Sequence, residues 1–526
     1  MWHYQIVTAV EPRPNPYESL TVAADRFVDQ PLAPRLLLPW RVVALTTRAR
    51  VTRTPSTRRR SDFVAVGACA GLVTLAVVVG IRADNNGSGG VHAGLPPLAA
   101  HWMPHAGVGT PLAVGIAILV VGYGPALASR LSWRTALMAT YAAAIGWTFG
   151  LAMIDGWRQG IVSRLLKHTE YLRSVPRIDA AGIGASLHTF TDHILQNVPD
   201  AWPAHVAGHP PGAILVFVEL QRLGMGGGAW AGVVCVVVGC LAAVAVPSTM
   251  RTLGAPASAR RILPFCVLFP GAVWVGCSAD GLFTGVTTTG VAVFAYGCRR
   301  TGARGVAGCA VGGLLLGVAL YLSYGLMLLA LVVLAVAALS GNALRAWRSL
   351  LVAGVGVIAV ALAFTAAGFW WLDGYHLLVV RYYQGVAAVR PYSYWVWANL
   401  ASLCLATGPA VAAGLARLRL HPAWAHMTGN VPMPSSAEDP RQAEEEDAAA
   451  PPERAVVVML AGAAALALVL ADLSGLSKAE VERIWLPFGV WLAVAVAILP
   501  LRGQRGWLAG QAGLALAVNH LLLTSW

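Results

Sequence analysis

The sequence predicts an all-α fold, a polytopic bundle of about 13 transmembrane helices. Of its 526 residues, 57% are hydrophobic and 12% are charged, and the mean hydropathy is +0.64. Soluble domains contain roughly 45–50% apolar and about 25% charged residues, and a single soluble core stops growing at roughly 250–300 residues. Most of this apolar surface is therefore expected to face lipid.

The positive charge lies mainly in short segments between apolar runs. Lysine and arginine (37) exceed aspartate and glutamate (24), which gives a net charge of +13. In a soluble protein such an excess suggests a nucleic-acid partner. Between transmembrane helices, however, arginine and lysine mark the cytoplasmic side. We therefore expect topology to explain the charge and no nucleic acid to bind.

The N-terminal part is expected to be cytoplasmic. Residues 1–61 contain no span and form an Arg-rich tail, whose Arg58–Arg60 cluster comes just before the first apolar run. Because that run starts only at Phe63, a cleavable signal peptide is not expected. Residues 62–135 are expected to hold two additional spans before the core.

A membrane-embedded core is expected over residues 136–419. Its first span, near 136–154, ends at Asp155, and the polar segment 155–228 follows as an extracytoplasmic loop. Long ordered loops are usually functional. Residues 210–223 within it are apolar but too short to cross a bilayer, which predicts a juxtamembrane helix lying in the outer interface.

The complete set of spans follows from the apolar runs. They are expected near residues 63–81, 108–129, 136–154, 229–249, 262–279, 281–297, 306–322, 326–340, 350–371, 394–413, 455–471, 484–500 and 507–524. If these spans alternate, the arginines of five loops, from Arg251 to Arg505, all fall in the cytoplasm. Residues 420–454 are expected to form a disordered acidic cytoplasmic linker, and residues 455–526 to supply the last three spans.

This topology collects polar side chains on the outer side, where carboxylates near lipid are costly unless paired or functional. Asp280 joins two apolar runs with no other charge nearby, and it is either a helix N-cap or a functional residue. His209 precedes two prolines that suit the first turn of a helix; the alternative is a rigid turn with a surface histidine. Outer tyrosines and Trp395 are expected to anchor the protein among lipid headgroups.

The order of these features resembles the membrane-embedded GT-C glycosyltransferase superfamily, in particular protein O-mannosyltransferases and bacterial lipid A aminoarabinose transferases. In those families a span ends at an acidic residue, and a long outer loop leads to a His-Pro-Pro or Lys-Pro-Pro motif before an amphipathic helix. Two further spans follow, with an aspartate at the outer end of the second. Here Ile154-Asp155-Gly156, His209-Pro210-Pro211-Gly212 and Asp280 occupy these places. The match covers roughly residues 136–300, and later parts match by topology alone.

The chain departs from the family pattern in two respects. Two additional spans precede the matching core, and Gly156 stands where protein mannosyltransferases have a second acidic residue. The second departure leaves the type of acceptor open. Near the C-terminus, Lys478-Ala-Glu480-Val-Glu482-Arg483-Ile-Trp485 resembles an element that begins a late span in several bacterial GT-C enzymes.

The resemblance implies transfer of a sugar from a polyprenyl-phosphate donor to an acceptor hydroxyl outside the cytoplasm, with inversion of the anomeric centre. An acceptor hydroxyl needs a positioned general base. The catalytic candidates lie at the outer ends of core spans or in the outer loop: Asp155 as the base, then His209 and Asp280, with Glu170 and His205 as further loop candidates.

The donor phosphate needs fixed cations. The candidate phosphate ligands all lie on the outer side: Arg381, Arg390, Tyr324 and Arg483. For Arg483 a local ion pair with Glu480 or Glu482 is the alternative, and Tyr324 could equally hydrogen-bond the backbone.

The sequence specifies no cofactor. Asp155, His209 and Asp280 are compatible with a shared divalent cation, Mg²⁺ or Mn²⁺. The eight cysteines have no CxxC spacing and are interpreted as small core residues. The expected partners are the lipid-linked donor, membrane lipids and a glycan, lipid or protein acceptor of the cell envelope. The expected location is the bacterial inner membrane.

Two other classes of function stay open. A transporter or flippase of a lipid-linked sugar would place polar residues near the middle of spans, often in broken helices. Most spans here lack mid-span charge, which favours the enzyme. A non-catalytic membrane assembly protein, whose outer loop binds a partner, would have much the same sequence.

Overall fold

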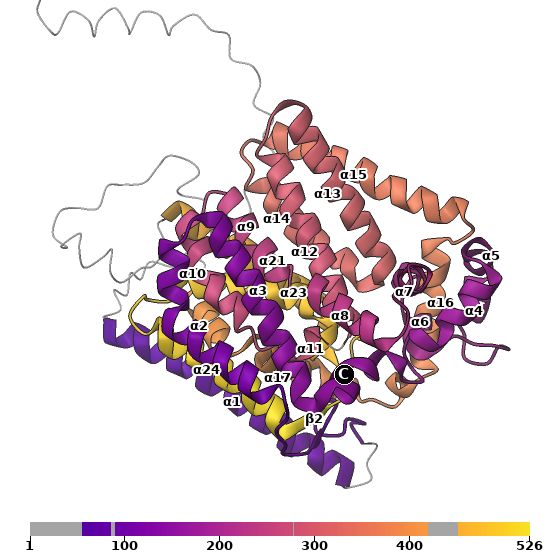
Figure 1. The fold of residues 1–526 in the computed structure, drawn as a ribbon, viewed down its shortest axis with the longest axis horizontal. Helices are drawn as coiled ribbons and strands as arrows, with labels where there is room; N and C mark the ends of the chain where they lie inside the picture. The colour runs from indigo at the N-terminus through magenta and orange to yellow at the C-terminus, as the bar shows by residue number, and fades with distance from the viewer. Residues whose placement is uncertain (1–54, 86–89, 277, 419–450, 526) are drawn as a thin grey trace, which may run out of the picture. The chain divides into compact units, whose positions relative to one another are not determined.

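The computed structural model describes residues 55–85, 90–276, 278–418 and 451–525. Most of these residues are helical, as the sequence predicts (Figure 1). The predicted cytoplasmic tail and acidic linker lie mostly outside the described residues. Only their last residues are seen, at the starts of helices α1 (Pro55–Asn85) and α21 (Pro451–Leu473).

Eight helices among the described residues are long and apolar enough to cross a membrane. They are α1, α2 (Thr110–Arg130), α3 (Trp133–Ala152), α8 (Gly228–Gly239) joined to α9 (Ala242–Thr252), α12 (Ala279–Cys298), α13 (Gly302–Leu322), α15 (Ala343–Ala366) and α21. A bent pair of helices would make a ninth. The chain is therefore a multi-pass membrane protein.

The remaining predicted spans fall on helices that are short, broken or, for the last span, less apolar. The bent pair, α17 (Tyr392–Thr407) and α18 (Pro409–Arg417), turns through 107°. Gly408 between them has a positive φ of 85°, which glycine adopts readily. The others are α10 (Pro256–Val267) with α11 (Ala272–Val275), η6 (Tyr324–Leu329) with α14 (Ala330–Ala338), α22 (Val481–Ile484) with α23 (Leu486–Leu492) and η8 (Ala493–Ile498), and α24 (Gln504–Leu521).

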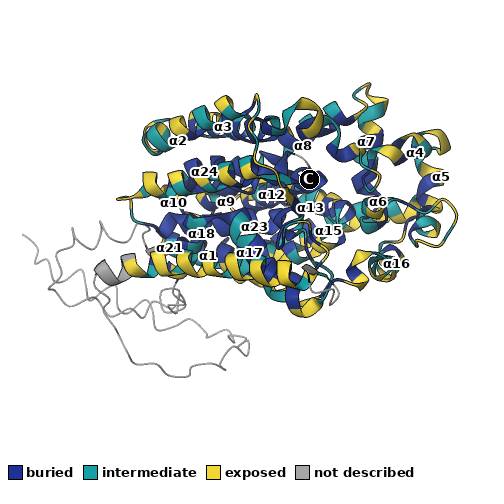
Figure 2. Cartoon of the chain, turned by 90° about the horizontal axis from the view of Figure 1, so that it is seen from below, coloured by how far each residue is buried: buried dark blue, intermediate teal, exposed yellow. Residues whose placement is uncertain are grey.

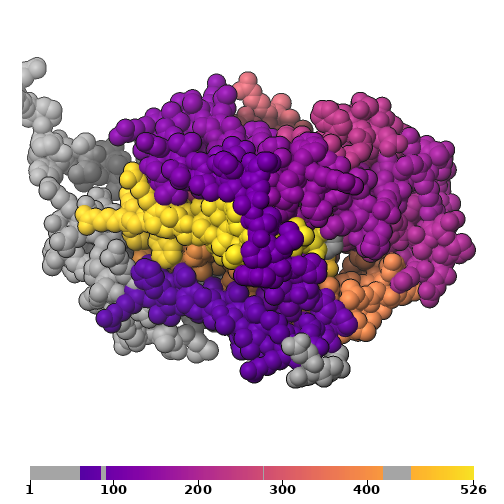
Figure 3. All heavy atoms as spheres, turned by 60° about the horizontal axis from the view of Figure 1, so that its bottom comes forward, coloured from indigo at the N-terminus to yellow at the C-terminus, as the bar shows by residue number. Residues whose placement is uncertain are grey.

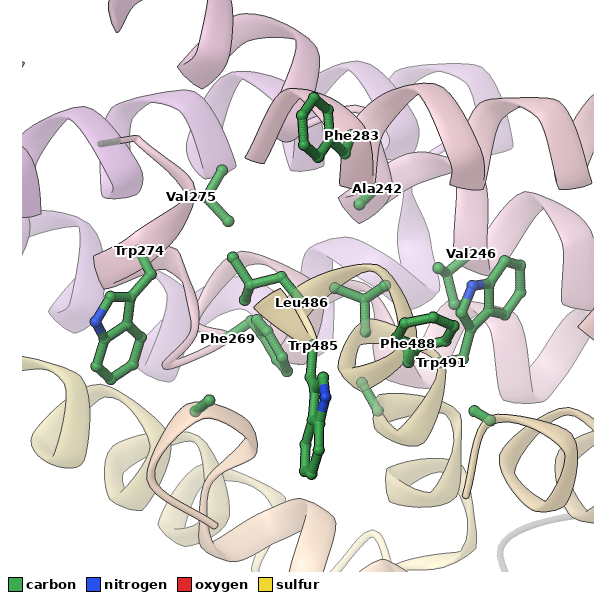
Figure 4. Packing of buried hydrophobic residues seen from close by; sticks show 14 of the residues in the cluster. Ala242, Val246, Phe269, Trp274, Val275, Phe283, Trp485, Leu486, Phe488 and Trp491 are labelled. Atoms are coloured by element: carbon green, nitrogen blue, oxygen red, sulfur yellow. The ribbon is translucent and has the colours of Figure 1, made fainter. Parts of the chain in front are cut away.

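Helix α23 and the turn η8 that follows it form the most deeply buried stretch of the bundle. Every residue from Leu486 to Leu499 is buried, and a helix that is apolar on all sides belongs inside a protein. Figure 4 shows Trp485 and Leu486 beside Phe269 of the neighbouring chain segment. The burial colours of Figure 2 show the contrast with α1, whose surface is largely exposed.

Arginines from several loops gather at one end of the bundle, here called the arginine end. Arg417 pairs with Asp62, with 2.6 Å between Nε and Oδ1. Arg260 donates to the carbonyl of Ala128 in the last turn of α2 and to that of Leu131, the residue after this helix. Glu453 accepts a hydrogen bond of 2.7 Å from the backbone N–H of Ser258. Loops that the sequence predicts to share one side of the membrane therefore meet at one end.

The opposite end, here called the acidic end, lies at the far ends of helices that begin at the arginine end. A two-stranded antiparallel sheet forms there between β1 (Ala100–Trp102) and β2 (Leu522–Thr524). It joins the loop before α2 to the segment after α24. In Figure 3 the C-terminal residues, in yellow, lie between the purple and indigo N-terminal segments.

The two N-terminal spans belong to the same bundle as the core. Helix α1 packs against the bent pair α17 and α18, and α2 packs against α3, α10 and α24. These contacts bury the inner sides of the first two spans against segments that are distant in sequence. Both spans therefore help to position the loops at the acidic end.

Candidate functional site

The segment predicted as a long outer loop folds into a series of short helices. They are η1 (Met153–Asp155), η2 (Trp157–Val162), η3 (Arg164–Leu166), η4 (Leu172–Ser174), α4 (Val175–Ala181), α5 (Ile183–His188), η5 (Phe190–His193), α6 (Ala204–Gly208) and α7 (Gly212–Arg222). Helix α7 corresponds to the predicted juxtamembrane helix. A Cβ at Gly212 would lie 2.5 Å from the carbonyl oxygen of Tyr321, so the His-Pro-Pro-Gly turn needs glycine to approach α13.

A buried ion-pair network lies where α12 begins, and Arg483 is its centre. The Arg483 guanidinium donates to Oδ2 of Asp280 at 2.6 Å and to Oε2 of Glu480 at 2.8 Å. Nε2 of His205 lies 3.0 Å from Nη2 of Arg483, and Nδ1 of the same ring lies 2.6 Å from Oε1 of Glu170. Four of the predicted site residues are thus brought together from α12, α22, α6 and the segment before η4.

Arg390 is joined to these residues through Glu480. Oε1 of Glu480 lies 3.3 Å from Nη2 of Arg390, and Arg390 also donates to the carbonyls of Lys478 at 2.9 Å and His92 at 3.1 Å. Its guanidinium lies over the Trp395 ring, 5.8 Å from the centroid. The Arg483 network is defined here as six side chains: Glu170, His205, Asp280, Arg390, Glu480 and Arg483.

The start of α12 holds Asp280 in place. Ser278 is the N-cap residue and Asp280 lies in the first turn, so Asp280 is not the helix cap. An acidic group in this turn also interacts favourably with the helix dipole. A Cβ at Gly281 would lie 2.0 Å from the carbonyl oxygen of Val275. Glycine therefore lets the helix start close against α11, with Asp280 facing Arg483.

The backbone before α22 has an unusual conformation. Ala479 and Glu480 both have positive φ angles, of 71° and 63°, which cost non-glycine residues of order 1 kcal/mol each. Asn399 holds this turn, because its amide donates to Asp472 at 2.8 Å and accepts from the N–H of Ala479 at 3.3 Å. Packing by α17 thus fixes a strained turn that aims Glu480 at two arginines.

The hydrogen bonds of His205 indicate its protonation state. Arginine can only donate, so Nε2 of His205 accepts from Arg483 and the ring proton lies on Nδ1, toward Glu170. The ring is then neutral. Three carboxylates face two guanidiniums, so the network has a formal charge of −1. Asp280 and Glu170 are each 4% exposed, and buried charges that do not balance are costly.

The charges of this network shift the pKa values of its members. Burial raises the pKa of Glu480, but the positive charges of Arg483 and Arg390 outweigh burial and leave the pKa lowered. Burial lowers the pKa of Arg483, but the negative charges of Asp280 and Glu480 outweigh burial, so the pKa is raised overall. Both shifts favour the ionised forms of Glu480 and Arg483. Glu482 beside them is fully buried, and burial raises its pKa to about 7.

His209 lies next to the network as a neutral side chain. Its Nδ1 is 2.8 Å from the carbonyl oxygen of His205 and 2.9 Å from the hydroxyl of Tyr171, and its ring packs on Phe283 with 5.5 Å between centroids. Burial lowers the pKa of His209 to about 4. At neutral pH this histidine is uncharged, so it can orient groups by hydrogen bonding but cannot act as a cation.

Asp155 belongs to a second cluster at the same end. Its Oδ1 lies 2.6 Å from Nε2 of His105, and its Oδ2 accepts from Arg164. The end of α3 adjoins the loop before α12, since a Cβ at Gly276 would lie 3.7 Å from that of Ala152. Within the described residues, Asp155 pairs with His105 and Arg164, whereas Asp280 pairs with Arg483. The three predicted catalytic residues therefore lie in neighbouring but separate arrangements.

Tyr324 and Arg381 lie away from both clusters. The buried Tyr324 ring packs against Trp371 and Tyr375, with centroids 5.0 and 5.8 Å apart. Its hydroxyl has no hydrogen-bond partner among the described residues. Arg381 donates to the side chain of Gln196 at 3.2 Å. The structure therefore does not bring these two predicted phosphate ligands to the Arg483 network.

The arrangement of Asp155, His209 and Asp280 does not fit a shared divalent cation. The part of the chain that the structure describes contains no group of three or more His, Cys, Asp or Glu side chains placed to hold a metal ion. Asp280 faces the guanidinium of Arg483, and Asp155 faces that of Arg164. Each carboxylate thus already has a cation where a metal would bind.

Sequence reasoning missed several residues of the site. The sequence predicts Glu480 only as a local partner of Arg483, and the structure contains that ion pair. Glu480 also pairs with Arg390, which the sequence does not indicate. The spacing of three residues between Glu480 and Arg483 was the only signal for Glu480. His105 and Arg164 gave none, because their contacts with Asp155 depend on how separate segments fold together.

Comparison with known proteins gives no relative on which to base an identification. No known protein-family description matches the chain. No curated protein sequence is significantly similar to it. The function must therefore be inferred from the geometry of the site.

Proposed function

We propose that the protein is a membrane glycosyltransferase. It would transfer a sugar from a polyprenyl-phosphate donor to an acceptor hydroxyl at the outer face of a bacterial inner membrane. The observation that carries this proposal is the Arg483 network, in which Arg390 and Arg483 converge on one carboxylate at a bundle end. Buried charges in a membrane protein are rare unless they serve a function.

The two arginines suit the donor phosphate. A guanidinium offers a planar fork of donors to phosphate oxygens, and fixed cations stabilise the charge that develops on a leaving phosphate. Asp280 would hold Arg483 in place, with 2.6 Å between their charged atoms. His205 and Glu170 would orient the same guanidinium from the other side. No step in this proposal requires a metal ion.

Asp155 is the proposed general base. A direct attack by the acceptor hydroxyl inverts the anomeric centre and needs a carboxylate within hydrogen-bond reach. The contacts with Arg164 and His105 would fix the orientation of the Asp155 carboxylate. Its position beside the loop that leads to Asp280 is compatible with an acceptor site next to the donor site.

The proposed orientation follows from the arginine end. Loops rich in arginine face the cytoplasm in membrane proteins. The contacts of Arg417, Arg260 and Glu453 join several such loops at one end. With that end in the cytoplasm, the Arg483 network lies on the outer side, where the acceptor would be a glycan, lipid or protein of the cell envelope.

One observation bears on the alternative of a transporter. Discontinuous helices in transporters point free helix ends at a substrate, and the bent pair α17 and α18 is such a break. Here, however, the side-chain oxygen of Gln511 accepts from the N–H of Ala410 at 3.2 Å, and its amide donates to the carbonyl of Thr407 at 2.9 Å. The break is therefore satisfied internally, which favours the enzyme.

The decisive experiment for the proposed function is a transfer assay. Purified protein is incubated with radiolabelled polyprenyl-phosphate sugars and bacterial membrane acceptors, and Asp280→Asn, Asp155→Asn and the surface control Asp179→Asn are compared. We expect transfer by the wild type and the control and its loss in the two site variants. Retained transfer in both site variants would remove the site, and transport of lipid-linked sugar into vesicles without transfer would favour a flippase.

A further inference from the structure

We propose that Glu480 is an internal anion that occupies the phosphate position of the donor site, and that the donor phosphate displaces it on binding. This inference rests on the proposed function, because it assigns the donor phosphate to Arg390 and Arg483. It gives Glu480 a role in donor binding that the proposed function does not include. Donor binding then becomes a competition between the Glu480 carboxylate and the donor phosphate for the same two arginines.

The contacts of Glu480 are those expected of a bridging phosphate. Its two carboxylate oxygens bind different guanidiniums: Oε1 lies 3.3 Å from Nη2 of Arg390, and Oε2 lies 2.8 Å from Nη2 of Arg483. Arginine forks recognise carboxylate and phosphate oxygens with the same planar geometry. A phosphate group could therefore replace the carboxylate without moving either arginine.

The charge of the network favours replacement over addition. Asp280, Glu170 and Glu480 outnumber the two guanidiniums, so the buried site is already negative by one charge. A polyprenyl-phosphate sugar is a phosphodiester with one negative charge. If it bound beside Glu480, the unmatched buried charge would double, at high cost in a region of low dielectric constant. If it replaces Glu480, the charge of the site stays unchanged.

The structure also provides a way for the carboxylate to leave. The Glu480 side chain is 18% exposed, against 6% for Arg483 and 9% for Arg390. The turn before Glu480 is anchored, because the N–H of Lys478, two residues earlier, donates to the Tyr382 hydroxyl at 2.8 Å. The carboxylate can therefore rotate away while the turn and the arginines remain in place. The Glu480 backbone has a positive φ of 63°, a conformation that the surrounding packing imposes.

Competition by a tethered anion has a consequence for turnover. The product of sugar transfer is a phosphomonoester, which carries about −1.5 to −2 charges at neutral pH, so it would bind the two arginines more tightly than the donor does. A carboxylate fixed beside the site acts at a high effective concentration. Return of Glu480 to the arginines therefore assists release of the lipid phosphate.

The test measures binding of farnesyl phosphate to the full-length protein in detergent micelles by titration calorimetry. Glu480→Gln removes the charge and keeps the shape, and Glu480→Asp keeps the charge but shortens the reach to both arginines. Glu219→Gln, at an exposed carboxylate of α7 that pairs with Arg222, is the matched control. Farnesol and inorganic phosphate separate the contributions of the chain and the free anion.

We expect Glu480→Gln to bind farnesyl phosphate about tenfold or more tightly than the wild type, since a charge-assisted contact no longer competes. Glu480→Asp should fall between them, and Glu219→Gln should match the wild type. Unchanged or weaker binding by Glu480→Gln would overturn the inference. Inorganic phosphate should also bind more tightly to Glu480→Gln, because the same anion position is freed, and no gain for either phosphate would reject the internal anion.

An arginine variant separates failure of this inference from failure of the proposed function. If Arg390→Gln weakens farnesyl phosphate binding while Glu480→Gln leaves it unchanged, the phosphate site stands and the internal anion is rejected. If farnesyl phosphate binds no more tightly than farnesol to any variant, both are rejected. Thermal unfolding of each variant shows that loss of binding does not come from loss of fold.

Discussion

The arginine end and the acidic end contain the same kinds of charged residue in different arrangements. At the arginine end, Arg417 pairs with the single carboxylate of Asp62, and Arg260 donates to backbone carbonyls. At the acidic end, Glu480 is shared between Arg390 and Arg483, which also pairs with Asp280. At the arginine end, one cation faces one carboxylate. At the acidic end, the ion pairs are linked into a network that has more carboxylates than cations.

This difference shows that connectivity and charge balance, and not burial alone, separate a structural ion pair from a candidate site. Both ends bury their charges: Arg417 is 9% exposed and Arg483 is 5% exposed. A balanced pair that ties two loops together needs no further explanation. A network with more carboxylates than cations pays part of its own stability to place charges in a fixed geometry, which is typical of functional sites.

The largest effect is expected from Arg483→Ala. Removing the guanidinium leaves Asp280 and Glu480 as buried carboxylates without this partner, and such a change costs about 3–5 kcal/mol in the free energy of unfolding. Denaturant unfolding in detergent measures it. Loss of donor binding should accompany the loss of stability. A variant as stable as the wild type would contradict the burial of this network.

Arg417→Ala should cost about 3 kcal/mol for the same reason, because it leaves the buried carboxylate of Asp62 unpaired. Its effect sharpens the comparison, since no loss of farnesyl phosphate binding per folded molecule is expected. Titration of the folded fraction measures this. If Arg417→Ala abolished binding as Arg483→Ala does, the two ends would not differ in function.

Glu482→Gln tests the acidic end through pH. Burial raises the pKa of Glu482 from its ordinary 4.5 to about 7, so the folded state holds this proton more tightly than the unfolded state. The wild type should therefore lose about 3 kcal/mol of stability from this group as the pH rises from 4.5 to 7. Glu482→Gln should lack that loss.

Unfolding measured at pH 5 and pH 8 gives the difference between the two proteins at each pH. His209 contributes with the opposite sign between pH 4 and 6.5, because burial lowers its pKa to about 4. This contribution is common to both proteins and cancels in the difference. A difference that does not change with pH would show that Glu482 titrates normally.

The smallest effect is expected from Arg222→Ala on α7. Arg222 pairs with Asp179 and Glu219, but its side chain is 38% exposed. Solvent-exposed ion pairs contribute little to stability, so the free energy of unfolding should change far less than it does in Arg483→Ala. A cost as large as that of Arg483→Ala would show that exposure does not separate the two kinds of pair.

Much of the fold could be predicted from the sequence. Apolar runs gave the helices, and the arginines of separate loops do meet at one end, as Arg417 and Arg260 show. The breaks could not be predicted, because hydropathy continues through Gly408 and Pro409 while the backbone turns by 107°. The pairing of β1 with β2 joins segments that are far apart in the chain, and no local pattern indicates it.

The site was predicted in part. Asp280, His205, Glu170 and Arg483 come together because acidic and basic residues near spans need partners, and each was a candidate from the position of its charge. Which partner each residue chooses depends on side-chain geometry. For that reason Asp155 pairs with Arg164 and His105, and Arg381 bonds to Gln196, which sequence spacing could not indicate.

The most direct test of the central claim compares sugar transfer by Arg483→Lys and Arg417→Lys. Lysine keeps the positive charge but lacks the planar fork that binds two oxygens. With a radiolabelled polyprenyl-phosphate sugar, Arg483→Lys should lose transfer by about 100-fold or more, while Arg417→Lys should transfer sugar at the rate of the wild type. Equal transfer by the two variants would contradict the assignment of the Arg483 network as the donor site.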